Sequence, residues 1–118
     1  MINRIEEGLI MSELNKLTDG ELNQKAHQIM KPSDKFLYVG NYPDYCNRIG
    51  EVFKLVKFAE SKGIYCKIDT NGVSCSFYQP LIEGDKELAF VFGNGTFSLP
   101  KAITKAFILA FEEINKLT

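Results

Sequence analysis

The sequence has few of the residues that bind metals or attack substrates. It contains one histidine, His27, and three cysteines, Cys46, Cys66 and Cys75, which form no CxxC pair. Because a zinc site needs about four nitrogen, sulfur or oxygen ligands, we expect no metal. No cysteine or serine has an identifiable base partner, so we expect no catalytic residues and no enzyme.

Long apolar runs, a secretory signal and an excess of basic charge are also missing. The longest apolar stretches are far shorter than the roughly 20 residues that cross a bilayer. The 118 residues carry a net charge of −1, whereas proteins that neutralise phosphates are usually basic. An odd cysteine count without a signal sequence indicates a reducing compartment. We therefore expect a cytoplasmic protein with no membrane partner, whose cysteines act as small hydrophobic residues.

Two glycine-bearing loops carry partial ligand-binding patterns. Residues 93–95 begin like a dinucleotide-binding fingerprint, but the third glycine and the parallel βαβ context are missing. The acidic residues Glu83, Asp85 and Glu87 alternate around the other loop without the spacing of a calcium site. Solvated turns explain both patterns, and we expect no cofactor.

The N-terminus allows two interpretations. The codons for Glu6-Glu7-Gly8 can form a ribosome-binding sequence upstream of Met11, in which case residues 1–11 are a leader or a wrongly assigned start. Alternatively, this segment is an amphipathic helical start with Ile2, Ile5 and Leu9 on one side. In both cases residues 12–118 are expected to form a single domain.

The most informative stretch, residues 64–78, is typical of a β-hairpin. Asn71-Gly72 suits the two positive φ angles of a type I′ turn, and this turn sets Tyr65 opposite Tyr78. One face of the hairpin is then apolar and packs on the core. The other face is a binding surface if it stays open, or a second packing layer if a helix or residues 36–45 cover it. That face carries Tyr65, Lys67, Asp69, Ser74, Ser76 and Tyr78.

Helical periodicity predicts helices on both sides of the strands. Thr18 and Glu21 form a capping box that opens a helix over 19–30. Asp44 is expected to cap a second helix that ends at Gly63, and Pro100 opens the last one. The second helix is expected to place its apolar residues on one face, namely Ile49, Val52, Phe53, Val56 and Ala59.

A third strand is expected near residues 87–92, with Leu88, Phe90 and Phe92 alternating inward. The element order is therefore α-α-β-β-β-α. It predicts an α+β fold in which helices pack on a three-stranded antiparallel sheet, an alpha-beta-alpha sandwich.

The same order includes the helix, three strands and helix of a double-stranded-RNA-binding domain. Lys101 and Lys105, in the first turns of the last helix, are similar to the lysines with which such domains contact phosphates. The acidic pI of about 5.8 and Pro100 at a usually basic position argue against this alternative. Nucleic-acid binding is therefore the second hypothesis for function.

Four short motifs stand in order along the chain, at 17–23, 44–47, 63–64 and 99–103, with the sequences LTDGELN, DYCN, GI and LPKAI. Together they resemble the NinX-like proteins of lambdoid phages and the wider phage alpha-beta-alpha sandwich domain. The resemblance spans about residues 12–116. It implies a phage or prophage origin, a sandwich that favours a covered sheet face, and a small protein without established catalytic residues.

Accessory phage proteins of this size often block a host factor, and they include anti-CRISPR proteins and proteins that sequester immune signalling nucleotides. We therefore expect a phage protein that binds a host protein in the bacterial cytoplasm and inhibits host defence. An exposed hairpin edge or the apolar residues 36–39 could also support a homodimer. The expected binding residues are Tyr42, Asp44, Tyr45, Tyr65, Lys67, Tyr78 and, for the nucleic-acid alternative, Lys101 and Lys105.

Overall fold

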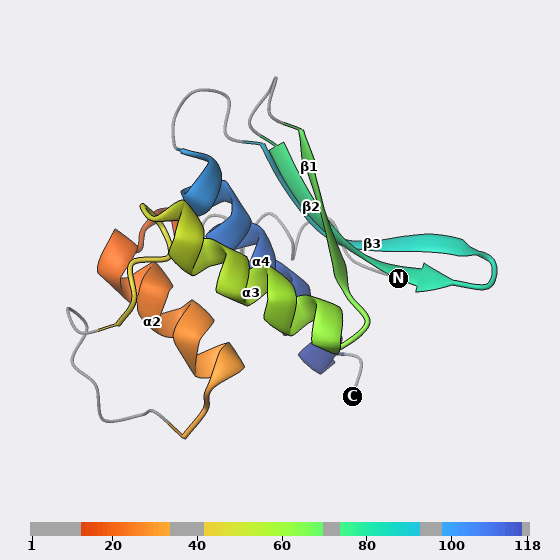
Figure 1. Cartoon of the computed structure of the whole chain (residues 1–118), viewed down its shortest axis with the longest axis horizontal. Coiled ribbons are helices and arrows are strands. Elements are labelled where there is room, and N and C mark those ends of the chain that lie inside the picture. The colour runs from red at the N-terminus through yellow and green to blue at the C-terminus, as the bar shows by residue number, and fades with distance from the viewer. Residues whose placement is uncertain (1–12, 34–41, 70–73, 93–97, 117–118) are drawn as a thin grey trace.

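The computed structural model describes residues 13–33, 42–69, 74–92 and 98–116. Its helices and three-stranded antiparallel sheet follow the expected order, so the predicted α+β fold is confirmed (Figure 1). The elements are α2 (Asp19–Met30), α3 (Ile49–Ser61), β1 (Tyr65–Asp69), β2 (Ser74–Leu81), β3 (Gly84–Phe92) and α4 (Leu99–Lys116). The N-terminal segment 1–11, the apolar residues 36–39, the Asn71-Gly72 turn and the loop 93–97 lie outside the described residues.

Helix α2 begins as predicted. The Thr18 hydroxyl accepts a hydrogen bond from the Glu21 N–H at 3.2 Å, and the Glu21 carboxylate accepts one from the Thr18 N–H at 3.1 Å. Both halves of the capping box are therefore present. Asp19 and Glu21 also place negative charge in the first turn, where it suits the positive end of the helix dipole.

The start of helix α3 differs from the prediction. Its N-cap is Arg48, which makes no side-chain cap, while the main-chain oxygen of Asp44 accepts hydrogen bonds from Asn47 and Arg48 in the preceding turn. The carboxylate of Asp44 accepts from Asn23 and Asn47. The prediction that Asp44 caps α3 is wrong, because this side chain joins the turn to α2 instead.

The buried face of α3 also differs in part from the prediction. The buried positions are Val52, Leu55, Val56 and Ala59, whereas Ile49 and Phe53 are exposed. Leu55 lies three residues after Val52 and four before Ala59, so it shares their buried face, whereas Phe53 lies on the flank of the helix and Ile49 is its first residue. The prediction that Ile49 and Phe53 face the core is therefore wrong.

Gly63 terminates helix α3 just after its last turn, as predicted. Gly63 has a φ of 78°, its N–H donates to the oxygen of Glu60 at 3.0 Å, and the N–H of Ile64 donates to the oxygen of Ala59 at 2.9 Å. This pair of hydrogen bonds is a Schellman motif, which satisfies the last carbonyls of the helix.

In the sheet, β2 lies between β1 and β3. Tyr65 lies opposite Tyr78 and Cys66 opposite Phe77, the register predicted from the hairpin sequence. Phe77 is fully buried, and Cys66 packs against the core from the same face. The apolar face of the hairpin is therefore the core face.

Strand β3 contains a bulge. Phe77 of β2 pairs with Ala89, whereas the next residue of β2, Tyr78, pairs with Glu87. Leu88 is left without a partner in β2, so two residues of β3 span the space of one.

The bulge changes which residues of β3 face the core. Leu88 and Ala89 are both buried, and after them Val91 points inward while Phe90 and Phe92 are exposed. The prediction that Leu88 faces the core is confirmed. The prediction that Phe90 and Phe92 do so is wrong, because the extra residue shifts the inward positions by one.

All the described helices lie on one side of the sheet (Figure 1). Helix α4 contacts β2 and β3, α3 contacts β1, and α2 packs against α3 and α4. At the centre of this core the ring of Phe107 lies 6.0 Å from that of Phe77 and 4.7 Å from that of Phe111. Among the described residues no second layer covers the opposite face of the sheet, and none of their helices is long and apolar enough to span a membrane.

Strands β2 and β3 continue beyond the end of β1. The pairing of β1 stops at Tyr65 with Tyr78, whereas β2 and β3 remain paired from Gln79 with Lys86 to the turn at Ile82. We call residues 79–86 the arm, and it projects away from the helices (Figure 1). Ile82 at its tip is fully exposed.

Candidate functional site

The structure divides the expected binding residues between two places. Tyr65, Lys67 and Tyr78 lie on the face of the sheet that points away from the helices. The remaining candidates gather where the start of α2, the turn 42–48 and the start of α4 meet. These are Tyr42, Asp44, Tyr45, Lys101 and Lys105.

The outer face of the sheet carries an aromatic patch. Tyr65 and Tyr78 face each other with ring centroids 6.0 Å apart, and Tyr65 is 40 % exposed. Phe90 and Phe92 of β3 are 53 % and 51 % exposed on the same face. We call these four residues the outer-face patch. Across the three strands the rows of this face are Tyr65–Tyr78–Glu87, Lys67–Ser76–Phe90 and Asp69–Ser74–Phe92.

A hollow of about 630 Å³ lies against the outer-face patch. Tyr78 and Phe90 contribute its aromatic walls. Carboxylates predominate among its charged groups, which are Lys67, Asp69, Asp85 and Glu87. This charge favours a partner that presents apolar groups together with basic ones.

The aromatic turn, by contrast, is part of the interior. Tyr42 and Tyr45 are buried, and both lie against the buried ring of His27. The Tyr45 hydroxyl is hydrogen-bonded to Nδ1 of His27 at 2.7 Å, and the ring centroids of Tyr42 and His27 are 5.3 Å apart. The structure thus places both tyrosines where they fix the turn to α2 rather than where a partner could reach them.

Asn23, which sequence reasoning missed, links this turn to α2. Its amide oxygen accepts a hydrogen bond from the Cys46 N–H at 3.0 Å, and its amide nitrogen donates to the Asp44 carboxylate at 3.1 Å. Asn47 donates to the carboxylates of both Asp44 and Asp19 at 3.1 Å. The side chains of Asp44 and Asn47 are therefore hydrogen-bonded to each other and to residues of α2.

The two lysines of α4 are also engaged inside the molecule. Lys101 forms an ion pair with Asp19 at 2.8 Å, and this hydrogen bond lowers the pKa of the Asp19 carboxyl below its ordinary value. Lys105 is buried and donates to the side-chain oxygen of Asn15 at 2.7 Å, and burial lowers its pKa. These lysines hold α4 to the N-terminal part of the fold, so they do not form an exposed cluster for phosphates.

The three cysteines lie in or against the core, and the hydrogen bond with Cys75 lowers the pKa of the Cys66 thiol below its ordinary value. Burial raises the pKa of Cys46 to about 12, which keeps this thiol protonated at neutral pH. Cys66 and Cys75 lie with their sulfur atoms 3.2 Å apart on the core side of the sheet, and their hydrogen bond, together with burial, raises the pKa of Cys75. Within the described ranges no group of three His, Cys, Asp or Glu side chains is placed to hold a metal ion.

Phe90 and Phe92 are the surface residues that sequence reasoning assigned to the core. Residues 88–92 form an uninterrupted apolar run, so the sequence does not indicate which side chains point inward. The bulge at Leu88 decides this, and no turn residue marks it in the sequence.

Comparison of the chain with protein-family models, with curated proteins and with solved structures finds no match. The fold and the candidate surface therefore depend on the chain's own residues, and the resemblance to small phage proteins stays a prediction.

Proposed function

We propose that this protein acts by binding another protein through the outer-face patch and catalyses no reaction of its own. The observation that carries the proposal is the exposure of Tyr65, Phe90 and Phe92 on one face of a sheet whose other face is packed on helices. Contiguous exposed apolar groups usually mark a site of interaction, and aromatic side chains supply much of the binding energy of interfaces.

The chemistry of the surface specifies the partner further. The hollow beside Tyr78 and Phe90 accepts an apolar side chain, and the carboxylates of Asp69 and Glu87 favour a neighbouring lysine or arginine. A standard interface buries about 800 Å² on each side, so the partner must extend past the patch onto neighbouring strand residues. We infer a folded protein partner with an apolar projection flanked by basic residues.

We further propose that the partner is a host protein and that binding inhibits host defence during phage infection. Support comes from the resemblance of four sequence motifs to small phage proteins. Inhibition could act by blocking a host protein or by sequestering a signalling nucleotide. The outer face of the sheet favours the protein target. Lys67 is the single amine among the residues that line the hollow, and nucleotide phosphates require more positive charge.

The test compares two variants in a capture experiment from bacterial lysate. Phe90→Ser combined with Tyr65→Ser removes two of the four aromatic side chains of the patch, while Phe53→Ser removes an aromatic side chain of similar exposure from α3. We expect a host protein that the natural sequence and Phe53→Ser recover equally and that the patch variant recovers at least about tenfold less. Equal recovery by all three proteins would overturn the role of the patch.

A phage-plating experiment tests the proposed defence role separately from partner binding. Expression of the natural protein in a host with an active defence system should raise the plating efficiency of a sensitive phage, and the patch variant should not. If both proteins leave plating unchanged while the partner is still captured, the binding proposal stands and the defence proposal fails.

The nucleic-acid alternative has its own test. At low salt a duplex-binding domain retards double-stranded RNA in a gel, and the affinity falls steeply as salt rises. We expect no retardation, because Lys101 is paired with Asp19 and Lys105 is buried. Retardation that Lys101→Glu abolishes would favour the alternative over the protein-binding proposal.

A further inference from the structure

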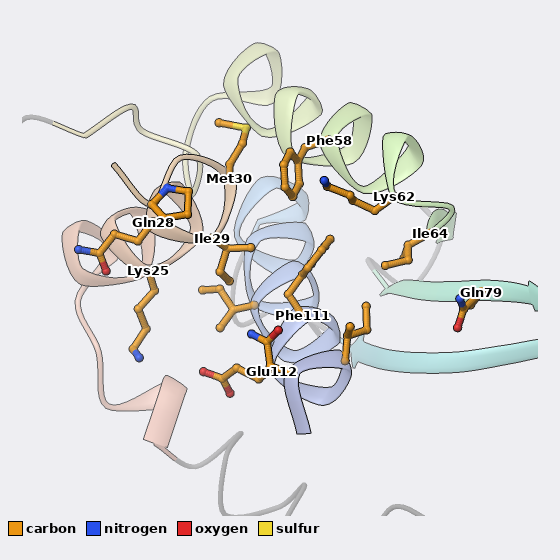
Figure 2. Close-up of a pocket in the computed structure, with 14 residues that line it drawn as sticks. Lys25, Gln28, Ile29, Met30, Phe58, Lys62, Ile64, Gln79, Phe111 and Glu112 are labelled. Atoms are coloured by element: carbon orange, nitrogen blue, oxygen red, sulfur yellow. The ribbon is translucent and has the colours of Figure 1, made fainter. Parts of the chain in front are cut away.

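A second concave surface lies on the helical side of the molecule, remote from the outer-face patch. It is a groove of about 950 Å³ between α2, the end of α3 and the second half of α4 (Figure 2). Its size is that of a site for a sizeable ligand or a short segment of another chain. The walls are apolar and come from Ile29, Met30, Phe58, Ile108, Phe111 and Ile114.

Positive charge predominates at the rim of this groove. Lys25 and Lys62 line it, against the single carboxylate of Glu112. The amine of Lys62 lies 5.5 Å from the centre of the Phe58 ring. Neither Lys25 nor Lys62 forms an ion pair with a carboxylate of the described residues. The groove therefore favours an occupant that is apolar and carries negative charge.

The arm has the complementary properties. Its tip exposes Ile82 completely and Leu81 by half, in a part of the hairpin that no other described element covers. Glu83 and Asp85 come within three residues of Ile82, and they outnumber Lys86, the one basic residue of the arm; neither carboxylate has an ion-pair partner among the described residues. A projecting hairpin with an apolar, acidic tip matches an apolar groove with a basic rim.

The position of the groove relative to the arm also fits. Gln79, the first residue of the arm, lines the groove, so the groove opens at the base of the arm (Figure 2). The arm extends about 10 Å from Gln79 to Ile82, at about 3.3 Å per residue. The arm projects away from the helices whose residues line the groove, so it cannot fill the groove of its own chain (Figure 1).

A twofold axis beside the arm would bring the arm of one copy to the groove of the other. When two arms lie side by side in opposite directions, the tip of each reaches the base of the other, where the partner's groove opens. The same contact then forms twice, as in most symmetric dimers. Pro80 lacks an N–H on the free edge of β2, which disfavours strand pairing between arms and favours contact through side chains.

We propose that the occupant of the groove is the arm of a second copy of this chain, so that the protein forms a dimer by reciprocal arm exchange. Ile82 and Leu81 enter the apolar floor of the partner's groove, and Glu83 and Asp85 lie near its Lys25 and Lys62. The four aromatic residues of the outer-face patch stay free in this arrangement, so the dimer presents two copies of that patch.

The test uses charge reversal and rescue, followed by sedimentation of the full chain. We expect the natural protein to form a dimer at concentrations on the order of 10–100 µM, because the contact is small. Glu83→Lys with Asp85→Lys should give a monomer, since the arm would then repel the groove. Lys25→Glu with Lys62→Glu should do the same from the other side. Lys57→Glu, an exposed site on α3, should leave the dimer unchanged.

Mixing the two monomeric variants supplies the decisive result. Each mixed contact pairs opposite charges, an acidic arm with a basic groove or a basic arm with an acidic groove, so a heterodimer should form. This rescue also shows that both variants are folded.

Three results would overturn the proposal: a natural protein that stays monomeric at 100 µM or so, variants that still dimerise, or a mixture that stays monomeric. A photo-reactive residue at position 82 gives an independent measurement. It should cross-link to groove residues of a second, isotope-labelled copy, and a cross-link only to a captured host protein would instead assign the arm to that partner.

Discussion

Asn23 is the side chain whose replacement tests most directly how the turn 42–48 is fixed. In Asn23→Ala the buried N–H of Cys46 loses its acceptor, and the Asp44 carboxylate loses one of its two amide donors. An unsatisfied buried donor costs about 1–3 kcal/mol, and the second hydrogen bond contributes about 1 kcal/mol. We expect the free energy of unfolding to fall by about 2–4 kcal/mol.

Urea unfolding followed by circular dichroism measures this change in the free energy of unfolding. On heating, the melting temperature should fall by about 8–16 °C, at about 4 °C per kcal/mol for a chain of this size. Gln24→Ala is the matched control, because it removes the neighbouring amide on the same helix, which makes none of these contacts. It should change the stability by less than about 0.5 kcal/mol.

Asn23→Asp separates the two hydrogen bonds. It keeps an acceptor for the Cys46 N–H but places a carboxylate beside that of Asp44, so it should be destabilised at pH 7 and recover as the carboxyls protonate. A loss below about 1 kcal/mol in Asn23→Ala would refute the reasoning, since the turn would then be held by its aromatic packing alone.

Two further predictions concern the ends of helices. Gly63→Ala should lower the free energy of unfolding by about 1–2 kcal/mol, because Gly63 has a φ of 78° and an added Cβ meets no neighbour, so only backbone strain acts. Gly63→Asn should lose less stability. Equal losses for the two variants in urea unfolding would contradict this prediction. Asp19→Asn should remove a pH-dependent part of the stability. The folded-state pKa of Asp19 is lowered by Lys101, so its contribution is present above the unfolded value of about 3.9 and is lost as the pH falls through the lowered pKa. The natural protein should therefore exceed Asp19→Asn in urea at pH 7 and match it near pH 2 or so, and a difference that persists in acid would count against the ion pair.

The parts of the fold that the sequence predicts correctly are those that short-range chemistry specifies. The capping box of Thr18 and Glu21 sets the start of α2, and Gly63 sets the end of α3, because each depends on groups within one helical turn. The register of Tyr65 opposite Tyr78 is the one that the Asn71-Gly72 sequence predicts, since a two-residue hairpin loop at that point allows only one pairing.

The errors arise where distant contacts compete with local preference. Asp44 is a good N-cap residue, but Asn23 and Asn47 bind its carboxylate, and helix α3 begins after it. Tyr42 and Tyr45 appear in the sequence as an aromatic turn suited to binding, yet His27 lies between them and the core closes over all three. No local pattern encodes a contact between residues about 20 positions apart in the chain.

With the bulge in β3, Phe90 and Phe92 point outward, and a deletion can test whether the extra residue acts only by shifting the strand by one position. Without Ala89 the strand would alternate regularly, with Leu88 opposite Phe77 on the core face and Phe90 still on the outer face. We expect the deletion variant to fold, to lose no more than about 1 kcal/mol of stability and to keep the capture of a partner.

Deletion of Ser76 is the control, because it also shortens the sheet by one residue but acts in the central strand. β2 is paired on both sides, so this deletion moves either Cys75 or Phe77 from the core face to the outer face. It should unfold the protein or cost more than about 4 kcal/mol. Amide spectra and urea unfolding distinguish the two deletions. If deleting Ala89 were as damaging as deleting Ser76, then the extra residue of β3 would be an essential part of the core, and the exposure of Phe90 could not be attributed to a shift of one position.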